Sequence, residues 1–504
     1  MVTFHVIDYS ISNLKNLFQK YSNTPAQNLS AKIHLTYFEE YFKELAAKTI
    51  LVESPYIDHD YLEDFSAYYV KCFNKYERFC TRLHFFSIPF SDDEFTRLLR
   101  SEDDSIDKES LNEEYLGFIV VKPIPLTFIG RTCLKTYPLS GGRDYPFRHE
   151  YHVNLFGLNL FVKSLAYQEQ DSIVAACAST AIWTAFQATA YLFQHSVPTP
   201  VEITKAAVKF FPLSNRHFPN KGLSEEQMAQ AIRDVGLEPY LISTSEAHII
   251  KASVYAYQKA GIPLVLGIEI AEEGDDNPIG RHAVTISGYR MEGKKTSFPR
   301  SRFHLLSSRI NKIYAHDDQV GPFARMEFLP DGTKLSTSWP DSHGKLGNIT
   351  ANPTILLVPL YNKLRIPFDS ILKVIFKLDE LFDIIDDNLH LGIAEIEWEI
   401  FLSNSNHLKE EVLNSELTGE EKFKILTRSL PKYVWRAIAH LNGEKIELLF
   451  DSTDIEQGEI FLGWIKYSEN LFKTIKTIAD NIELRAIRFM QLHSILKRLR
   501  DYDH

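Results

Sequence analysis

The sequence predicts an α+β protein of several domains. In the central part of the chain, helix-like patterns dominate residues 168–260, whereas β-branched strand patterns dominate residues 261–317. Shorter helical and strand stretches lie before and after this part. Helices and strands that occupy separate stretches are typical of the α+β class. A chain of 504 residues is long enough for two to four domains, each with its own core.

The N-terminal part is predicted to contain a helical segment, residues 1–47, and an α+β module, residues 48–164. The turn-prone sequence Asn-Thr-Pro at 23–25 separates two helix-like stretches of the first segment. In the module, apolar strand patterns are interspersed with amphipathic helices. The expected helices are 12–21, 37–47, 61–79 and 92–99, and the expected strands are 48–60, 82–87, 115–122, 130–133 and 153–161.

Residues 165–335 are predicted to form the core domain. Pro200 marks one helix start, and Ser224 with Gln227 forms the capping-box pattern that marks another. Strand patterns follow these helices. The expected helices begin near 177, 201, 224 and 247, and the expected strands lie near 240, at 261–270, at 281–289 and at 313–315.

Residues 336–354 are rich in Ser, Gly, Asn and Pro, which predicts a linker or a surface loop. The last region, residues 355–504, is predicted to be α/β at first and then helical. Its end has a basic final turn, which complements the dipole of a helix. The expected strands are 354–360, 393–402 and the two arms of a hairpin at 431–440 and 445–451, and the expected helices are 367–385 and 468–500.

Cys177 lies at the expected start of a helix in the core domain, and small residues follow it at 178–181. Asp171 or Ser172 is expected to cap this helix, because a short oxygen side chain accepts from the free N–H groups of the first turn. The positive end of the helix dipole favours the thiolate form of a cysteine. Cys177 is therefore a candidate nucleophile. The alternative is a small core residue, since free cysteines are usually buried.

Two glutamines, Gln168 and Gln170, lie just upstream of Cys177. A side-chain amide at such a place can donate a hydrogen bond to an oxyanion. Either glutamine is therefore a candidate donor.

A candidate base and a candidate carboxylate follow Cys177 along the chain. His282 lies at the start of an expected strand, and Asp317 and Asp318 follow the short strand 313–315. In thiol catalysis an imidazole takes the thiol proton and later protonates the leaving amine, while a carboxylate orients the imidazole. Cys177, His282 and Asp317 thus form a candidate triad, with Asp318 as the alternative carboxylate.

These residues resemble those of the papain-like cysteine peptidases, most closely the branch that removes double-glycine leaders from bacteriocins. The resemblance covers residues 165–330 only, roughly. It implies a papain-like core with the cysteine at a helix N-terminus and the histidine and aspartate on antiparallel strands. It implies Cys177 as nucleophile, His282 as general base and acid, Asp317 as orienting carboxylate and Gln170 as oxyanion-hole donor, with no cofactor. The matching residues are Gln170, Cys177, Trp183, Arg281-His282-Ala283-Val284 and Tyr314-Ala315-His316-Asp317-Asp318.

Composition argues against several other classes of protein. The net charge of −11 argues against general nucleic-acid binding, because phosphate neutralisation needs an excess of Lys and Arg. No apolar run is long enough for a transmembrane helix, and the N-terminus lacks the pattern of a signal peptide. The four cysteines show no paired metal spacing, which favours a reduced, cytoplasmic compartment.

A group of metal-ligating residue types lies in the N-terminal module: Glu53, Asp58, His59, Asp60 and His84. Their spacing matches no known ligand arrangement. An Asp just before a helix is typical of an N-cap. We therefore predict a helix cap and solvated charges, and no metal.

The expected function is that of an intracellular cysteine peptidase, which hydrolyses an amide bond in a protein or peptide through an acyl-enzyme. An acyltransferase, deamidase or transglutaminase with the same triad is an alternative, because the acyl-enzyme is common to all of them. A second alternative is an inactive papain-like scaffold that serves as an interaction module. The flanking modules are expected to gate access or to recruit the substrate, with a regulatory protein partner. No nucleic-acid or membrane partner is expected.

Overall fold

The computed structural model describes residues 4–102, 108–147, 149–171, 176–209, 222–274, 277–299, 301–330, 332–341, 343–390, 395–453, 459–484 and 487–501. Contacts divide the chain into two units. The first unit consists of Met1–Ser245, Gly261–Gly288 and Lys312–Pro359, and the second consists of Glu246–Ala260, Tyr289–Asn311 and Leu360–His504. The four domain ranges expected from the sequence stay predictions.

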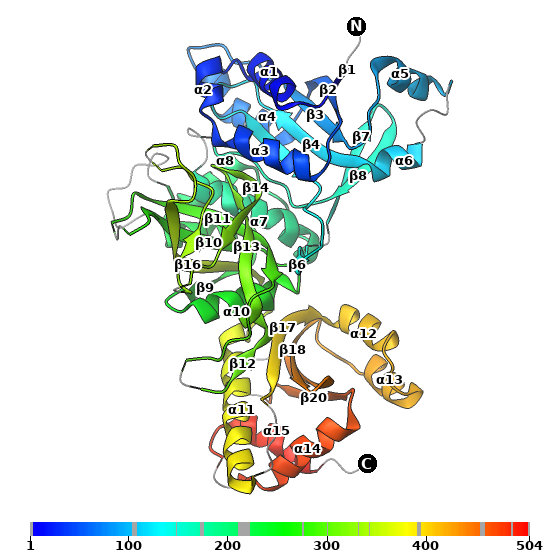
Figure 1. Cartoon of the computed structure of the whole chain (residues 1–504), viewed down its shortest axis with the longest axis vertical. Coiled ribbons are helices and arrows are strands. Elements are labelled where there is room, and N and C mark those ends of the chain that lie inside the picture. The colour runs from blue at the N-terminus through cyan, green and yellow to red at the C-terminus, as the bar shows by residue number, and fades with distance from the viewer. Residues whose placement is uncertain are drawn as a thin grey trace. The chain divides into compact units, whose positions relative to one another are not determined.

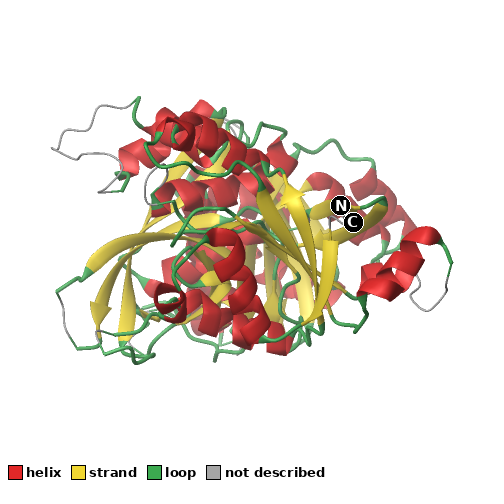
Figure 2. Cartoon of the chain, turned by 90° about the horizontal axis from the view of Figure 1, so that it is seen from above, coloured by secondary structure: helices red, strands yellow, loops and turns green. Residues whose placement is uncertain are grey.

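The predicted α+β class is confirmed, with helices and strands in both units (Figure 2). Nearly all described strand pairs are antiparallel, such as β10 with β11 and β18 with β19. The short pair β12 with β17 is parallel. The mostly antiparallel pairing agrees with an α+β fold rather than a doubly wound parallel one.

The N-terminal half of the first unit contains a five-stranded sheet in the order β1-β2-β3-β4-β5, with α1 and α3 beside it (Figure 1). The segment expected to be helical thus also contributes a strand. The elements are β1 (Phe4–Asp8), α1 (Ile11–Ser22), α2 (Ala26–Ser30), α3 (Ile33–Glu44), β2 (Thr49–Tyr56), α4 (His59–Ala67), η1 (Tyr69–Lys71), β3 (Cys80–Phe86), α5 (Asp92–Arg100), α6 (Lys108–Glu113), β4 (Tyr115–Val121), β5 (Ile129–Leu134), β7 (Glu150–Leu155) and β8 (Leu158–Lys163).

The rest of the first unit is built on an eight-stranded sheet. Six of its strands follow the order β14-β13-β11-β10-β16-β15, and the other two are β6, which pairs with β11, and β9, which pairs with β16. The elements are β6 (Arg143–Asp144), α7 (Cys177–Phe193), α8 (Pro200–Ala207), α9 (Glu225–Asp234), β9 (Leu237–Ser243), β10 (Leu264–Glu272), β11 (Gly280–Met291), β13 (Ile310–Asp317), β14 (Gly321–Glu327), β15 (Leu335–Ser336) and β16 (Ile349–Tyr361).

One aromatic core joins the two halves of the first unit. Phe42 of α3 stacks on Phe85 of β3 with ring centroids 4.1 Å apart. The same buried cluster includes Tyr314 of β13 and Phe323 of β14. Aromatic side chains bury large apolar areas, so this core fixes α3 against the strands that carry the candidate triad.

The second unit contains a five-stranded sheet in the order β12-β17-β18-β19-β20, and helices α11, α14 and α15 gather together in it (Figure 1). The predicted hairpin at 431–451 is confirmed as β18 and β19. The elements are α10 (Ala247–Gln258), β12 (His304–Leu305), η2 (Leu306–Arg309), α11 (Phe368–Leu389), β17 (Glu397–Asn404), α12 (Ser405–Leu413), α13 (Gly419–Leu426), β18 (Tyr433–Leu441), β19 (Glu444–Asp451), β20 (Phe461–Lys466), α14 (Glu469–Asp480) and α15 (Met490–Arg500).

Two predicted helices are too long. The helix expected at 61–79 ends at Ala67, because Tyr69 turns inward and its hydroxyl donates to Asp171 at 2.5 Å. The helix expected at 468–500 is divided into α14 and α15. The guanidinium of Arg500 donates to the carbonyl of Ala479 at 2.9 Å, so the basic end of α15 caps the end of α14 rather than extending one helix.

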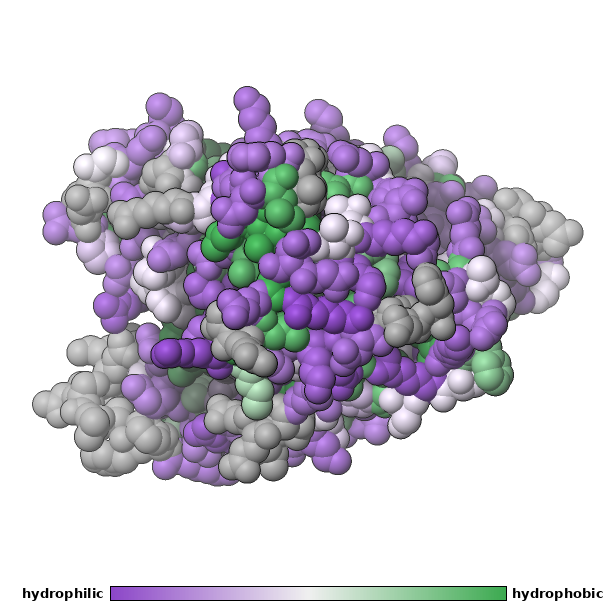
Figure 3. All heavy atoms as spheres, turned by 90° about the horizontal axis from the view of Figure 1, so that it is seen from below, coloured by the Kyte–Doolittle hydropathy of each residue, from purple (hydrophilic) through white to green (hydrophobic). Residues whose placement is uncertain are grey.

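The face shown in Figure 3 is mostly hydrophilic, with a smaller hydrophobic strip. In the part of the chain that the structure describes, no helix has the length and apolar character needed to span a bilayer.

Candidate active site

Cys177 is the first residue of helix α7, and its side chain is partly exposed. The N-cap is Ala176, which makes no side-chain capping hydrogen bond. The expected cap by Asp171 is wrong, because α7 begins six residues later and the Asp171 carboxylate accepts from the Tyr69 hydroxyl. Ser172 lies outside the described residues. The thiol therefore lies beside main-chain N–H groups of the first turn of α7, which no N-cap side chain among the described residues caps.

Two buried hydroxyl groups on β11 connect this strand to helix α7 and to strand β13. The Thr285 hydroxyl on β11 donates to the Ala181 carbonyl on α7 at 2.7 Å. The Ser287 hydroxyl, on the same strand, donates to the Tyr314 carbonyl on β13 at 3.2 Å. A buried hydroxyl left without a partner costs about 1–3 kcal/mol, so these bonds hold the helix and both strands in one arrangement.

The structure brings the three residues of the predicted triad together. His282 lies near the start of β11, and its Nε2 is 2.9 Å from Oδ1 of Asp317, the last residue of the adjacent strand β13. Cys177 and His282 line one cleft, and Cys177 helps to raise the pKa of the imidazole. Because Nε2 is engaged by Asp317, Nδ1 is the ring nitrogen that remains for the thiol.

Asp317 is held by two further donors. The main-chain N–H of Gln319 donates to Oδ1 at 3.0 Å, and Nε1 of Trp339 donates to Oδ2 at 2.8 Å. The Trp339 ring also packs edge-on against His282, with centroids 5.2 Å apart. Every oxygen of this carboxylate thus has a protein donor, which fixes the direction in which it faces the imidazole.

Trp339 is a site residue that sequence reasoning missed. It lies in the stretch 336–354, which was expected to be a linker or surface loop. The described residues 337–341 and 343–348 do form a loop, but residues 349–354 belong to strand β16, which pairs with β10. The strand pairing brings the loop back over the Asp317 carboxylate. A lone tryptophan in a polar stretch was the one available signal.

Asp318 supplies a second buried carboxylate. Its Oδ1 lies 3.4 Å from Nε2 of His282, and its Oδ2 accepts from the Gln319 side chain at 2.9 Å. Both carboxylates thus lie close to the His282 ring. Asp317 makes the direct hydrogen bond, and Asp318 adds a negative charge at longer range.

The three charges shift one another's pKa. Burial lowers the pKa of His282, but Asp317, Asp318 and the hydrogen bonds outweigh burial and raise it well above its usual range. Burial raises the pKa of Asp317, but His282 and the surrounding donors lower it overall. Burial, with help from Asp317, raises the pKa of Asp318 to about 6. At neutral pH the site therefore holds an imidazolium between carboxylates.

A cleft of about 510 Å³ opens onto Cys177 and His282. The start of α9 brings two glutamates to its lining, and β10 and β16 bring apolar side chains. A Cβ on Gly267 would lie 2.8 Å from the Ile355 side chain, so glycine leaves room where these two strands meet at the cleft. The lining residues are Cys177, Ala178, Gly222, Leu223, Ser224, Glu225, Glu226, Met228, Gly267, Ile268, Arg281, His282, Ala283, Thr354 and Ile355.

The two candidate oxyanion donors are not among the residues that line this cleft. Gln168 is buried, and its Nε2 has no acceptor in the described part of the chain. Gln170 is partly exposed. Residues 172–175, which connect both glutamines to α7, lie outside the described residues, so Gln170 and Gln168 both stay predictions as donors.

His282, Asp317 and Asp318 also form the one described group whose potential metal ligands lie close together, with ligand atoms within 4.8 Å of one another. Both Asp317 oxygens already accept from protein donors, which suits an imidazole–carboxylate pair better than a metal site. Glu53 and His84 of the N-terminal module bond to each other at 3.2 Å and belong to no such group in the described residues.

The predicted helix cap in the N-terminal module is confirmed, since Asp58 accepts from the Tyr61 N–H at the start of α4. The expectation of solvated charges is wrong for the two aspartates, which are both buried. Asp60 pairs with Arg131 at 2.8 Å, and that pairing offsets the cost of its burial. His59 is 70% exposed.

No protein-family model matches the chain, and no curated protein matches its sequence.

Proposed function

We propose that this protein is a cysteine peptidase with a papain-like core. The observation that carries the proposal is the set of Cys177, His282 and Asp317, in which His282 hydrogen-bonds to Asp317 and lines one cleft with Cys177. A thiol at a helix N-terminus, an imidazole on one strand and a carboxylate on the next supply the three roles that thiol catalysis needs.

In the proposed reaction, the His282 imidazolium holds Cys177 as a thiolate through the N–H of Nδ1, and the sulfur attacks the carbonyl carbon of the substrate. The C–N bond then breaks, and the imidazolium gives its proton to the leaving amine. Water adds to the thioester with His282 as base, which releases the acid and restores the thiol. The main-chain N–H groups at the start of α7, together with Gln170 or Gln168, supply donors for the oxyanion.

We propose a protein or peptide substrate and a reducing compartment such as the cytoplasm. All four cysteines, Cys72, Cys80, Cys133 and Cys177, are free, which a reducing environment maintains.

The first test is alkylation by iodoacetamide across pH, with each cysteine quantified by mass spectrometry. Cys72 is the matched control, because it is also partly exposed but has no histidine partner among the described residues. We expect Cys177 to react at least about tenfold faster than Cys72 near about pH 6, and we expect His282→Ala to abolish this advantage. Equal rates, or modification of Cys177 only after denaturation, would contradict the proposal.

Product analysis then separates hydrolysis from acyl transfer. With peptide substrates in ¹⁸O-labelled water, a peptidase places the label in the new carboxylate. A transferase instead links the acyl group to an added amine without the label, and a deamidase releases ammonia.

A further inference from the structure

We propose that the first turns of helix α3 position the carboxylates of the candidate active site, with His34 and Tyr37 as positioning residues. The inference rests on the proposed function. It concerns the turn of residues 317–322 between β13 and β14, which we call the carboxylate turn. Neither His34 nor Tyr37 lines the cleft.

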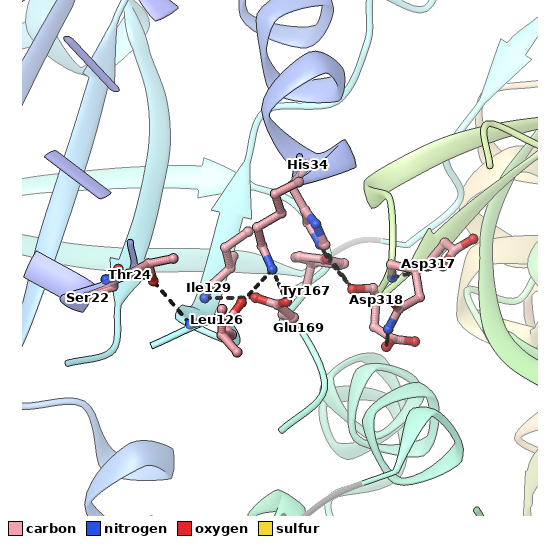
Figure 4. A network of polar contacts seen from close by, with 11 residues as sticks. Ser22, Thr24, His34, Leu126, Ile129, Tyr167, Glu169, Asp317 and Asp318 are labelled. Carbon is pink, nitrogen blue, oxygen red and sulfur yellow. Dashed lines mark hydrogen bonds and ion pairs between the residues drawn. The ribbon is translucent and has the colours of Figure 1, made fainter. Parts of the chain in front are cut away.

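His34 holds the middle of the carboxylate turn. Its Nε2 lies 3.0 Å from the carbonyl oxygen of Asp318 and 2.9 Å from the hydroxyl of Tyr167 (Figure 4). The Tyr167 hydroxyl also donates to the Asp318 carbonyl, at 3.3 Å. A carbonyl only accepts, so Nε2 of His34 carries the proton of that bond. Two buried donors thus converge on the main-chain carbonyl of Asp318, one of the two candidate carboxylate residues.

The His34 ring keeps this role throughout the working pH range. Burial lowers its pKa to about 3, with a further contribution from Lys32. The ring is therefore neutral, with one fixed donor, and it acts as a rigid hydrogen-bonding group rather than as a proton carrier.

Tyr37 holds the far end of the carboxylate turn. Its hydroxyl donates to the Pro322 carbonyl at 2.5 Å. Gly321 has a φ of +153°, and a Cβ there would lie 2.4 Å from the Tyr37 ring, so the ring rests directly on the turn. His34 and Tyr37 are three residues apart and therefore share one face of α3. That face contacts the turn at two places.

The residue just before α3 contacts the segment that leads to the nucleophile. Lys32 forms an ion pair with Glu169 and donates to the Leu126 carbonyl at 2.7 Å. Glu169 in turn accepts from the Ile129 N–H at 3.2 Å (Figure 4). Tyr167, the partner of His34, belongs to the same segment. The start of α3 thus connects the chain ahead of Cys177 to the chain that follows Asp317.

His34 and Tyr37 bond to main-chain carbonyls of the carboxylate turn, and we infer that they orient its carboxylates by fixing this main chain. The Asp318 carbonyl that His34 holds and the Gln319 N–H that donates to Asp317 Oδ1 belong to one peptide unit. A rotation of this unit would therefore remove a donor that orients the Asp317 carboxylate. Catalytic groups held within a fraction of an ångström of the productive geometry depend on such supporting bonds. His34 and Tyr37 therefore act on the imidazole, and through it on the thiol, without touching either.

The test is the pH profile of Cys177 alkylation in the full chain, with Cys72 as the internal reference. We expect His34→Ala to lower the Cys177 rate near about pH 6 by roughly tenfold and Tyr37→Phe to lower it by roughly threefold. His34→Gln should retain the rate within about twofold, because its amide can still donate to the carbonyl. Tyr41→Phe is the matched control, since that hydroxyl lies one turn further along α3 and donates to the Lys135 carbonyl instead.

Wild-type profiles for Cys177 in folded His34→Ala and Tyr37→Phe, or shifts no larger than that of Tyr41→Phe, would overturn the inference and leave the proposed function intact. If His34→Ala does not fold, Tyr37→Phe and His34→Gln decide the question. If wild-type Cys177 reacts no faster than Cys72, the proposed function fails, and the inference fails with it.

Discussion

Each unit contains a buried cation that pairs with two carboxylates, and the two clusters differ in what they can do. In the second unit, Arg436 on β18 bonds to Glu447 on β19 through two pairs of atoms, at 2.5 and 3.1 Å. Glu411 of α12 adds a second carboxylate at 2.7 Å. In the first unit, the corresponding members are His282, Asp317 and Asp318.

The identity of the cation separates the two clusters. Burial lowers the pKa of Arg436, but Glu447 and Glu411 raise it overall. This guanidinium therefore stays protonated and cannot act as an acid or a base. An imidazolium can give up its proton, and His282 faces both a thiol and a cleft. A buried charge alone therefore does not indicate a reactive centre. A cation that can give up its proton, beside a nucleophile, does.

The largest effect is expected when the histidine of the first cluster is replaced by the cation of the second, an arginine. His282→Arg keeps a positive charge beside the carboxylates but removes the acid and base. We expect amide hydrolysis to fall by about 10³-fold or more, while Cys177 alkylation near about pH 6 persists within roughly tenfold. Peptide cleavage and alkylation are measured on the same preparation, with Cys177→Ala as the blank. Retained cleavage would show that His282 is not the proton carrier.

The second test removes Arg436, the cation of the second cluster. Arg436→Met leaves the buried Glu447 without its cation, and we expect a loss of about 3–5 kcal/mol in the free energy of unfolding. The double variant Arg436→Met with Glu447→Leu should recover most of that loss. Urea denaturation measures both values. The wild-type alkylation rate of Cys177 should persist in both variants, and a change there would contradict a purely structural role.

Asp318→Asn tests whether the extra carboxylate of the first cluster makes stability depend on pH. The pKa of Asp318 is raised by burial to about 6, so the folded chain binds this proton more tightly than the unfolded chain. The wild type should therefore lose stability relative to Asp318→Asn as pH rises from about 4 to about 6, by up to about 3 kcal/mol. Unfolding is followed at several pH values. A difference that does not change with pH would show that Asp318 titrates normally.

The smallest effect is expected from Trp339→Phe. The variant keeps a ring beside His282 but removes the N–H donor to Asp317, whose pKa that donor helps to lower. We expect a loss of about 1 kcal/mol in stability and a few-fold lower alkylation rate of Cys177 at acid pH. Trp435→Phe, which removes the corresponding donor to the Ile366 carbonyl in the second unit, is the matched control and should leave Cys177 unchanged.

Local signals explain what could be predicted from the sequence. Cys177 is preceded by polar residues and followed by small ones, and His282 opens a β-branched strand, so the ends of these elements and their candidate residues were both recognisable. The α+β class followed from the same patterns. Asp317 was found because it ends a short strand.

The supporting contacts could not be predicted, because they join distant parts of the chain. Trp339 looked like part of a polar loop, Tyr37 looked like the start of an ordinary helix, and His34 lay just before that expected helix. Tyr69 ended a helix early through a hydrogen bond to Asp171, about one hundred residues away. Such tertiary contacts override local propensity, and a single sequence carries no signal for them.

The bond between His34 and Asp318 spans 284 positions of the chain, which bears on how the protein is made. During synthesis α3 leaves the ribosome long before the turn that it holds, and the donor Trp339 emerges later still. Strand β16, which pairs with β10, is complete only at Tyr361. A nascent chain that ends before these residues carries the thiol and the imidazole without the groups that orient them. Under the proposed function, the order of translation keeps the unfinished enzyme inactive towards its own growing chain.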